Sequence, residues 1–285
     1  MRGCPDPERR DDIGRRDELT RWYVLTAAPV DLGDIVACSW AARPSGEHRL
    51  TPDGCGDLLV TSDGHVVLCG PERTSWTFRL PGGTTAVGVR FRPGVMHALF
   101  HLDVSTIMNR RVPFGDIVGH GRAAHLASVL NPITELDDRR RAMVDALTRI
   151  VPPKPRTDAF AERCLELVAA HPSVTQSDIA VAVGLTPRQT HRRSLQTFGY
   201  GISTLTRILR FQRFLAVVAT ATGSGTSLAA FAVDAGYADH AHLSRDCRQI
   251  TGLTPTAFLR GYFSTFPDMS DPYKTARRLR ITIGR

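Results

Sequence analysis

Two segments in the C-terminal half carry Arg, Gln and His side chains that could contact the bases and phosphates of DNA. Arg can donate two hydrogen bonds to guanine, Gln is suited to adenine, and His can donate to a base or a phosphate. The segments are 178–193 and 228–245. The candidate DNA-binding residues are Arg188, Gln189, His191, Arg192 and Arg193, followed by His240, Ala241, His242, Ser244, Arg245 and Arg248. The alternatives are an ordinary solvated surface and, for His242, packing inside its own motif.

Both segments repeat the same spacing of small residues. Ala180 lies four positions before Gly184, and Ala232 lies four positions before Gly236. A small residue lets two short helices approach closely, and glycine adopts the left-handed conformation of a tight turn. The spacing therefore predicts two helix-turn-helix motifs, with Thr186 as the cap of the second helix in the first motif.

A long helix is expected between the two motifs, over 202–221. Its apolar residues occur on more than one face, so it should be buried on several sides and hold the motifs a fixed distance apart. Further helices are predicted over 158–170 and 256–262. The segment 158–263 is therefore predicted to be an all-α DNA-binding domain.

The N-terminal half has the pattern of a small antiparallel β-domain. Short apolar runs are separated by turn residues, and Asp-Gly between such runs favours a hairpin. The runs are 22–25, 35–40, 57–61, 65–69, 76–80 and 85–91, followed by helical patterns over 95–100, 117–130 and 135–151. The predicted fold class is α+β, with a barrel-like or sandwich-like sensory domain and its helices over 20–151. These helices could pair with a second copy of the chain or pack on the strands.

Two short motifs in the β-domain, 52–58 and 87–94, contain residues that could form an effector pocket. An inward Arg90 facing the carboxylates of Asp53 and Asp57 would recognise a polar ligand, and Cys55 lies between them in sequence. The alternative is structural. In that interpretation Asp53 belongs to a tight turn, Cys55 fills the core, and Arg90 is the ion-pair partner of Asp57.

Charge is distributed unevenly along the 285 residues. From Arg156 onward 16 Lys and Arg stand against 9 Asp and Glu, whereas the preceding residues contain 20 against 19. The excess positive charge lies in the half with the duplicated motif, as phosphate binding requires. Segments 1–19, 152–157 and 264–285 are expected to be a flexible leader, a Pro-rich linker and a flexible basic tail.

The sequence gives no sign of catalysis or of a metal site. Six cysteines are scattered without a CxxC pair, and the histidines lack metal-ligand spacing. No apolar run approaches the roughly 18 residues of a membrane span, and the N-terminus has no apolar signal core. We therefore expect a cytoplasmic protein that is not an enzyme and that uses no cofactor and no metal.

The C-terminal half resembles the DNA-binding domain of the AraC/XylS transcription regulators. The resemblance rests on the stretches 179–189, 207–213, 232–245 and 251–255. In that family one helix holds two recognition helices for successive major grooves. The resemblance implies that the residues contacting DNA include Arg188, His191 and Arg192 in one groove, and His240, Ala241 and Arg245 in the next. The motifs 52–58 and 87–94 resemble the sensory half of one AraC-type subgroup.

The chain departs from the family pattern at five positions. These positions are Thr190, Ser194, Leu195, Ile202 and Cys247. We expect the departures to weaken the packing of the first motif, and with it the sequence specificity of that motif.

The expected function is sequence-specific transcription regulation. The expected partners are double-stranded DNA and an unknown small-molecule effector, with RNA polymerase and a second copy of the chain as further candidates. An alternative is a DNA-anchored sensor or alkylation-repair enzyme that uses Cys55 or Cys38, although the spacing of Cys38, Cys55 and Cys69 lacks the clustered zinc ligands of such regulators. A third hypothesis is a DNA-binding module that needs no ligand.

Overall fold

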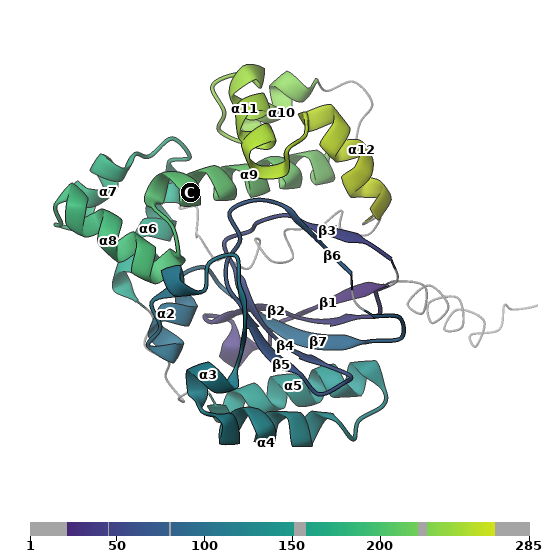
Figure 1. Ribbon diagram of the computed structural model, residues 1–285. Helices are drawn as coiled ribbons and strands as arrows, with labels where there is room; N and C mark the ends of the chain where they lie inside the picture. Colours follow the sequence, from purple (N-terminus) through teal and green to yellow (C-terminus); the bar gives the residue numbers. More distant parts are fainter. Residues whose placement is uncertain (1–21, 45, 80, 151–157, 222–226, 266–285) are drawn as a thin grey trace, which may run out of the picture.

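The computed structural model describes residues 22–44, 46–79, 81–150, 158–221 and 227–265 (Figure 1). Residues 263–265 are described by their backbone alone. The predicted leader 1–19, the linker 152–157 and nearly all of the tail 264–285 lie outside the described residues. An N-terminal antiparallel β-domain with helices precedes a C-terminal helical domain. This order confirms the predicted fold class.

The described strands of the N-terminal domain form two antiparallel sheets. The larger sheet has the order β1-β2-β7-β4-β5-β8, and β3 pairs with β6. The strands are β1 (Tyr23–Ala27), β2 (Val36–Ala42), β3 (His48–Leu50), β4 (Gly56–Thr61), β5 (Val66–Cys69), β6 (Trp76–Phe78), β7 (Ala86–Phe91) and β8 (Arg111–Pro113). Figure 1 shows β3 and β6 above the larger sheet, on the side of the C-terminal helices. Each of the six predicted runs contains a strand, whereas the three-residue strands β3 and β8 were not predicted.

Side chains of the larger sheet alternate between two faces, as the period of a strand requires. On one face, Leu58, Val60, Val87 and Val89 are fully buried in the core that the sheet shares with α4 (His120–Leu130) and α5 (Leu136–Ile150). The opposite face carries alternate residues of the same strands and is turned toward the C-terminal domain (Figure 1). One face of the sheet is therefore covered by its own helices, and the other is turned toward the C-terminal domain.

The helices of the N-terminal domain pack on the sheet. The apolar stripe of α5 contains Met143 and Leu147, which are fully buried in the core with the strands. Of the two alternatives for this stripe, the structure shows packing on the sheet. The helical pattern over 117–130 is divided into α3 (Gly115–Val118) and α4 by Gly119, whose φ of 92° interrupts the helix. The remaining elements of this domain are η1 (Val30–Leu32), α2 (Val95–Phe100) and η2 (Val104–Thr106).

The C-terminal domain is built on one long helix, α9 (Ile202–Thr220). The N-terminal part of α9 contributes Ile202, Leu205 and Ile208 to one core, and its middle contributes Phe211 and Phe214 to another. The first core also contains α6 (Ala159–Ala170), α7 (Gln176–Ala182) and α8 (Pro187–Phe198), and the second contains α10 (Leu228–Asp234), α11 (His240–Thr251) and α12 (Pro255–Thr265). The helix predicted over 202–221 thus corresponds to α9, which is buried in two cores. We call α9 the strut.

The two helix-turn-helix motifs have the same turn. Gly184 and Gly236 follow α7 and α10 with φ of 67° and 91°. One residue later, the N–H groups of Leu185 and Tyr237 donate to the carbonyls of Ala180 at 3.0 Å and Ala232 at 2.9 Å. Both alanines are buried, because the following helix packs against them. The repeated spacing in the sequence thus corresponds to a repeated structure.

Gly88 is tightly packed on the side of the sheet that is turned toward the C-terminal domain. A Cβ atom there would lie 2.5 Å from Trp40 Cζ2 and 2.8 Å from the carbonyl oxygen of Leu58. We predict that Gly88→Ala lowers the free energy of unfolding by about 1–3 kcal/mol, because neither the ring nor the backbone can move freely. Chemical denaturation of the full chain measures this change. The control is Gly82→Ala, where a Cβ atom has no neighbour within 4 Å. Equal denaturation midpoints for the two variants would contradict the packing described here.

Candidate functional site

The recognition helix of the first motif, α8, begins with a capping box. The Thr186 hydroxyl accepts a hydrogen bond from Gln189 N at 3.3 Å, and Gln189 Oε1 accepts one from Thr186 N at 2.9 Å. Pro187 occupies the first helical position, where a missing N–H has no cost. The capping box fixes the direction of the helix. Within it, the side-chain oxygen of Gln189 already accepts a hydrogen bond from Thr186 N.

Basic side chains of α8 lie in two different environments. Arg188, His191 and Arg192 are exposed, and the two arginines are four residues apart on one side of the helix. Arg193 instead donates to Asp158 Oδ1 at 3.1 Å, and its guanidinium lies 5.8 Å from the centre of the Phe160 ring. Arg193 therefore holds α8 against α6, which leaves Arg188 and Arg192 as the cations that extend from the exposed side.

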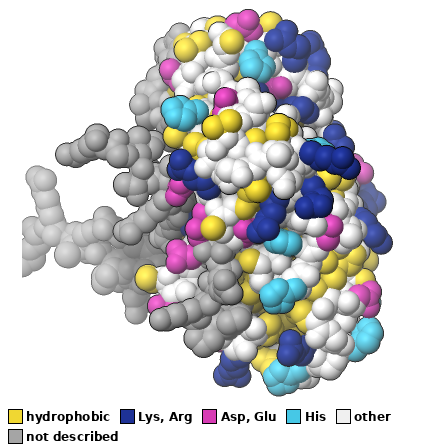
Figure 2. Space-filling model, turned by 90° about the vertical axis from the view of Figure 1, so that its left-hand side faces the viewer, with side chains coloured by type: hydrophobic (Ala, Val, Ile, Leu, Met, Phe, Trp, Pro, Cys, Tyr) yellow, Lys and Arg dark blue, Asp and Glu magenta, His cyan; other side chains and the backbone are white. Residues whose placement is uncertain are grey.

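The recognition helix of the second motif, α11, is capped by Asp239, whose Oδ1 accepts from His242 N at 2.6 Å. Exposed residues of this helix include His240, Ala241, Arg245 and Arg248, whereas Ser244 is half-buried. These side chains present a second polar and basic surface. Figure 2 shows Lys and Arg side chains gathered along one edge of the molecule, from the level of α11 to that of α8.

His242 packs inside the second motif. Its ring meets the Tyr237 ring edge to face at 5.1 Å, and its Nε2 lies 3.8 Å from Asp246 Oδ2. Burial and the nearby Arg210 guanidinium lower the pKa of His242, which favours the neutral imidazole at neutral pH. These contacts leave less of His242 available to DNA than of its neighbour His240.

A buried ion pair joins α11 to the strut. Arg210 on α9 donates from Nη2 to Asp246 Oδ2 at 2.8 Å, and both side chains are about nine-tenths buried. The Arg207 guanidinium is 3.8 Å from the same carboxylate, and Arg210 also lies 4.9 Å from the centre of the Tyr237 ring. The position of the second recognition helix therefore depends on charges that come from α9.

Four of the five departures from the family pattern are buried positions. The Thr190 hydroxyl donates to the carbonyl of Thr186 at 3.0 Å, and the Ser194 hydroxyl donates to that of Tyr200 at 2.7 Å. Ile202 and Cys247 are fully buried in the two cores. The small polar side chains are thus satisfied within the helix and its following turn, and the larger apolar ones fill the cores.

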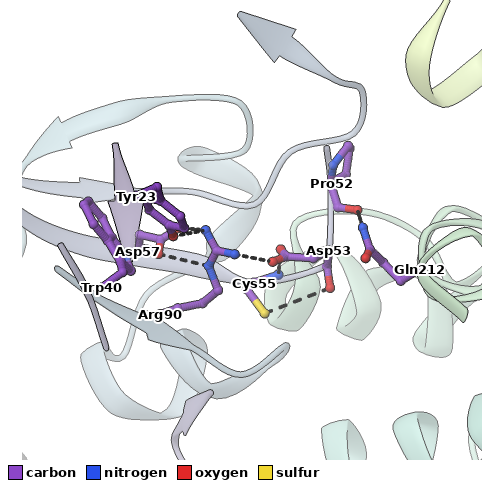
Figure 3. Close-up of polar contacts among 8 residues, drawn as sticks. All are labelled: Tyr23, Trp40, Pro52, Asp53, Cys55, Asp57, Arg90 and Gln212. Atoms are coloured by element: carbon purple, nitrogen blue, oxygen red, sulfur yellow. Dashed lines mark hydrogen bonds and ion pairs between the residues drawn. The ribbon is translucent and has the colours of Figure 1, made fainter. Parts of the chain in front are cut away.

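Arg90 brings together the four residues proposed for an effector pocket (Figure 3). It stands directly opposite Asp57 in the pairing of β4 with β7, and its Nε donates to Asp57 Oδ1 at 3.1 Å. Its Nη1 donates to Asp53 Oδ2 at 2.9 Å. Cys55 N donates to the other oxygen of Asp53 at 3.0 Å, and Trp40 Nε1 donates to Asp57 Oδ1 at 2.8 Å. We call Asp53, Asp57 and Arg90 the carboxylate–arginine cluster.

This cluster faces a cavity of about 1140 Å³ between the two domains. The larger sheet and strands β3 and β6 form one wall, and helices α6, α9 and α12 form the other. Aromatic residues that line the cavity are Trp22, Tyr23, Trp40, Trp76, Phe78 and Tyr262. The Asp53, Asp57 and Arg90 side chains are 24%, 19% and 16% exposed, so a molecule in the cavity can reach them.

Two thiols of the N-terminal domain, those of Cys55 and Cys69, are not activated. Burial raises the pKa of Cys55, and the neighbouring Asp53 raises it further. Burial also raises the pKa of Cys69 to about 12. Among the described residues, no three His, Cys, Asp or Glu side chains form a group that could hold a metal ion. Both cysteines are therefore protonated at neutral pH, and a thiol is a poor nucleophile.

The N-terminal domain contacts the strut and the C-terminal ends of both recognition helices. Gln212 of α9 donates from Nε2 to the carbonyl of Pro52 at 2.6 Å, next to the cluster (Figure 3). A Cβ atom on Gly94 would lie 2.9 Å from Phe198, the last residue of α8. Ser75 N donates to the carbonyl of Ile250, near the end of α11, at 2.7 Å. A change in the N-terminal domain can therefore reach α8, α9 and α11 directly.

Several residues of the site had no recognisable signal in the sequence. Tyr23 and Trp40 were included in strand-like runs, but a strand pattern does not show which side chains meet across a sheet. Gln212 lies in the family-like stretch 207–213, and its partner Pro52 is 160 positions away. Asp246 directly follows the second segment, 228–245, and only Arg245 and Arg248 beside it were selected. Each was missed because its role depends on a long-range contact.

Two segments of the chain match known domain families. Residues 26–113 match the family described as Domain of unknown function (DUF6597), and residues 179–261 match the family described as Helix-turn-helix domain. No curated protein sequence matches the chain. Among the described residues, no helix has both the length and the apolar character needed to cross a membrane.

Solved structures with a similar fold include ToxT from Vibrio cholerae. A ToxT variant in its apo form is 12% identical with a TM-score of 0.41, and the match covers 85% of this chain and 98% of that chain. Wild-type ToxT with a bound unsaturated fatty acid is 13% identical with a TM-score of 0.40, covering 83% of this chain and 94% of that chain.

The ion pair between Asp246 and Arg210 generates a stability prediction. Asp246→Asn keeps the shape of the side chain but leaves a buried guanidinium without its charged partner, so we expect a loss of about 3 kcal/mol in the free energy of unfolding. Urea denaturation of the full chain measures it. Asp234→Asn is the matched control, because Asp234 is exposed at the end of α10. If both variants unfold at the same urea concentration, the ion pair does not hold α11 on the strut.

Proposed function

Since residues 179–261 belong to the helix-turn-helix family of AraC type, we propose that this protein is a transcription regulator that binds double-stranded DNA through α8 and α11. The observation that carries the proposal is the exposed basic surface on both recognition helices, on motifs with identical turns. Residues in the N-terminal turns of such helices contact base edges in the major groove. Arg188, Arg192 and Arg245 are proposed to contact bases or phosphates.

The length of α9 supports contacts with successive grooves. Its 19 residues extend over roughly 28 Å at about 1.5 Å per residue. One turn of B-DNA is about 34 Å long, which is the separation of equivalent major-groove positions on one face. Because the two motifs pack along this helix, their separation is set by a rigid element of suitable length.

The remaining candidates on these helices have different proposed roles. His191, His240 and Ala241 are exposed and are proposed to contact DNA. Gln189, Arg193, His242 and Ser244 have partners in the protein or are partly buried, so their proposed role is to position the recognition helices. Arg248 is exposed two turns from the start of α11 and is proposed to contact a phosphate.

We also propose that a small-molecule effector occupies the cavity between the domains. Its volume of about 1140 Å³ is sufficient for a small organic ligand, since typical ligand pockets measure about 300–1,000 Å³. The cluster supplies the polar groups for recognition. Its neighbour Pro52 is bonded to Gln212 of α9, which provides a path from the effector to the strut. RNA polymerase is the proposed protein partner, as for a regulator of transcription in general.

A cysteine-based sensor or repair enzyme is not supported. Cys55 is 8% exposed and its pKa is raised by burial and by Asp53, so the reactive thiolate is scarce at neutral pH. The cavity instead supports non-covalent recognition of a ligand.

The DNA-binding proposal predicts that Arg192→Ala and Arg245→Ala each weaken binding by about 1–3 kcal/mol, since each removes a cation from a recognition helix. The measurement is a mobility-shift titration on a DNA fragment from the promoter region of the gene that encodes this chain, repeated at several salt concentrations. Arg122→Ala is the control, because Arg122 is exposed on α4 in the N-terminal domain. The assigned roles fail if neither substitution weakens binding more than Arg122→Ala does.

The proposed path to the strut predicts that Gln212→Ala loosens the contact between the domains. Loss of one hydrogen bond worth about 1 kcal/mol should raise local opening about fivefold. Hydrogen exchange of the full chain should then be faster in the 51–55 loop. Gln249→Ala, at an exposed position of α11, serves as the control. Unchanged exchange in that loop would show that Gln212 does not connect the domains.

A further inference from the structure

The carboxylate–arginine cluster has an excess of one negative charge. Two carboxylates, Asp53 and Asp57, share the single guanidinium of Arg90. We propose that the cavity binds an organic cation, an ammonium group on an apolar body, and that the ammonium group binds at these two carboxylates. The inference deepens the proposed function, because it rests on the cavity being the effector site and names the chemical class of the effector.

The two carboxylates have acceptor capacity left for an ammonium group. Each ionised carboxylate offers about four lone-pair positions, so the pair offers about eight. Five protein N–H groups donate to them: Nε, Nη1 and Nη2 of Arg90, Nε1 of Trp40 and the backbone N of Cys55. An ammonium group has three donors, which matches the remaining capacity. Because both carboxylates are partly exposed to the cavity, the ammonium group need not displace Arg90.

Four arginines of the N-terminal domain line the cavity, and each is bonded within the protein. Arg49 donates to the carbonyl of Thr251 at 3.3 Å, and Arg92 donates to that of Gly33 at 2.6 Å. Arg90 is shared by two carboxylates, and Arg111 is bonded to Glu72 at 2.6 Å. The Arg111 guanidinium also lies 3.4 Å from the centre of the Trp76 ring. An anion beside the cluster would therefore meet net negative charge. On the helical side, Arg213 donates to the carbonyl of Ala169 at 3.5 Å, and Arg210 is paired with Asp246.

Aromatic side chains next to the cluster suit the rest of a cationic ligand. The rings of Tyr23 and Trp40 have their centres 5.6 Å apart, and those of Trp22 and Tyr23 are 5.3 Å apart. The electron-rich faces of such rings attract cations, and the rings also provide apolar contact area. Leu25 and Leu59 extend the apolar lining along the sheet. The surroundings of the carboxylates thus fit a cation attached to an apolar group.

A buried hydroxyl lies behind the loop that carries Asp53. Tyr200 is 3% exposed, and its hydroxyl has no hydrogen-bond partner among the described residues. It lies 3.6 Å from the position of a Cβ atom on Gly54, the residue after Asp53. Burial raises the pKa of Tyr200, and Asp53 contributes to the shift, so the hydroxyl is a neutral donor.

The test compares three probes of similar size that differ in charge. Calorimetric titration of the full chain with phenethylammonium, phenylacetate and phenethyl alcohol should show the ammonium compound binding about tenfold more tightly than the other two, since its charge is paired with the cluster. Asp53→Asn and Asp57→Asn should each remove that preference. Asp63→Asn is the matched control, because Asp63 also lines the cavity but lies in the turn at the other end of β4. It should keep the preference of the wild type.

The double variant Asp53→Asn with Asp57→Asn changes the net charge of the cluster from negative to positive. It leaves Arg90 without either carboxylate, so phenylacetate should then bind more tightly than phenethylammonium. Tighter binding of phenylacetate by the wild type, or no preference among the three probes, would overturn the proposal. These titrations contain no DNA, whereas the promoter titration contains no probe. If the wild type does not prefer phenethylammonium but still binds the promoter fragment, an organic cation is rejected as the ligand class and the DNA-binding proposal stands.

Discussion

The burial of α9 in two separate cores is the constraint on which the C-terminal domain depends. Ile202 and Leu205 belong to the core of the first motif, and Phe211 and Phe214 belong to that of the second. A helix that packs on both sides cannot rotate for one motif without moving the other. The ion pair of Arg210 with Asp246 adds a directional contact to this packing. Two small motifs, each too small for a large core of its own, are thereby held as one rigid unit.

Much of this architecture could be predicted from the sequence because the signals are local. The spacing of Ala180 and Gly184 depends on the tight turn, and the same chemistry is repeated at Ala232 and Gly236. The apolar pattern over 202–221 predicted a helix buried on several sides, and six strand-like runs each contain a strand. The strands β3 and β8 were missed because they lie outside the apolar runs, whereas the equally short β6 lies within one.

The sequence was less informative about contacts between distant segments. The sequence left open whether Arg90 faces both Asp53 and Asp57 or pairs with Asp57 alone, because its bond to Asp53 depends on how the loop before β4 folds back. The contact of Gln212 with Pro52 joins segments 160 positions apart, and no periodicity indicates it. Arg193 had the same appearance in the sequence as Arg192, yet it pairs with Asp158 on α6. Whether a helical arginine is paired within the protein is decided by its tertiary neighbours.

The N-terminal domain contacts the recognition helices at their C-terminal ends, near Phe198 and Ile250, and leaves their capped N-terminal ends uncovered. In the proposed function, a ligand between the domains and a duplex on the outer surface would therefore occupy the same molecule at once. Simultaneous occupancy brings thermodynamic reciprocity: whatever factor the small molecule applies to the affinity for the duplex, the duplex applies to the affinity for the small molecule. An operator site would then act as an allosteric effector of the cavity.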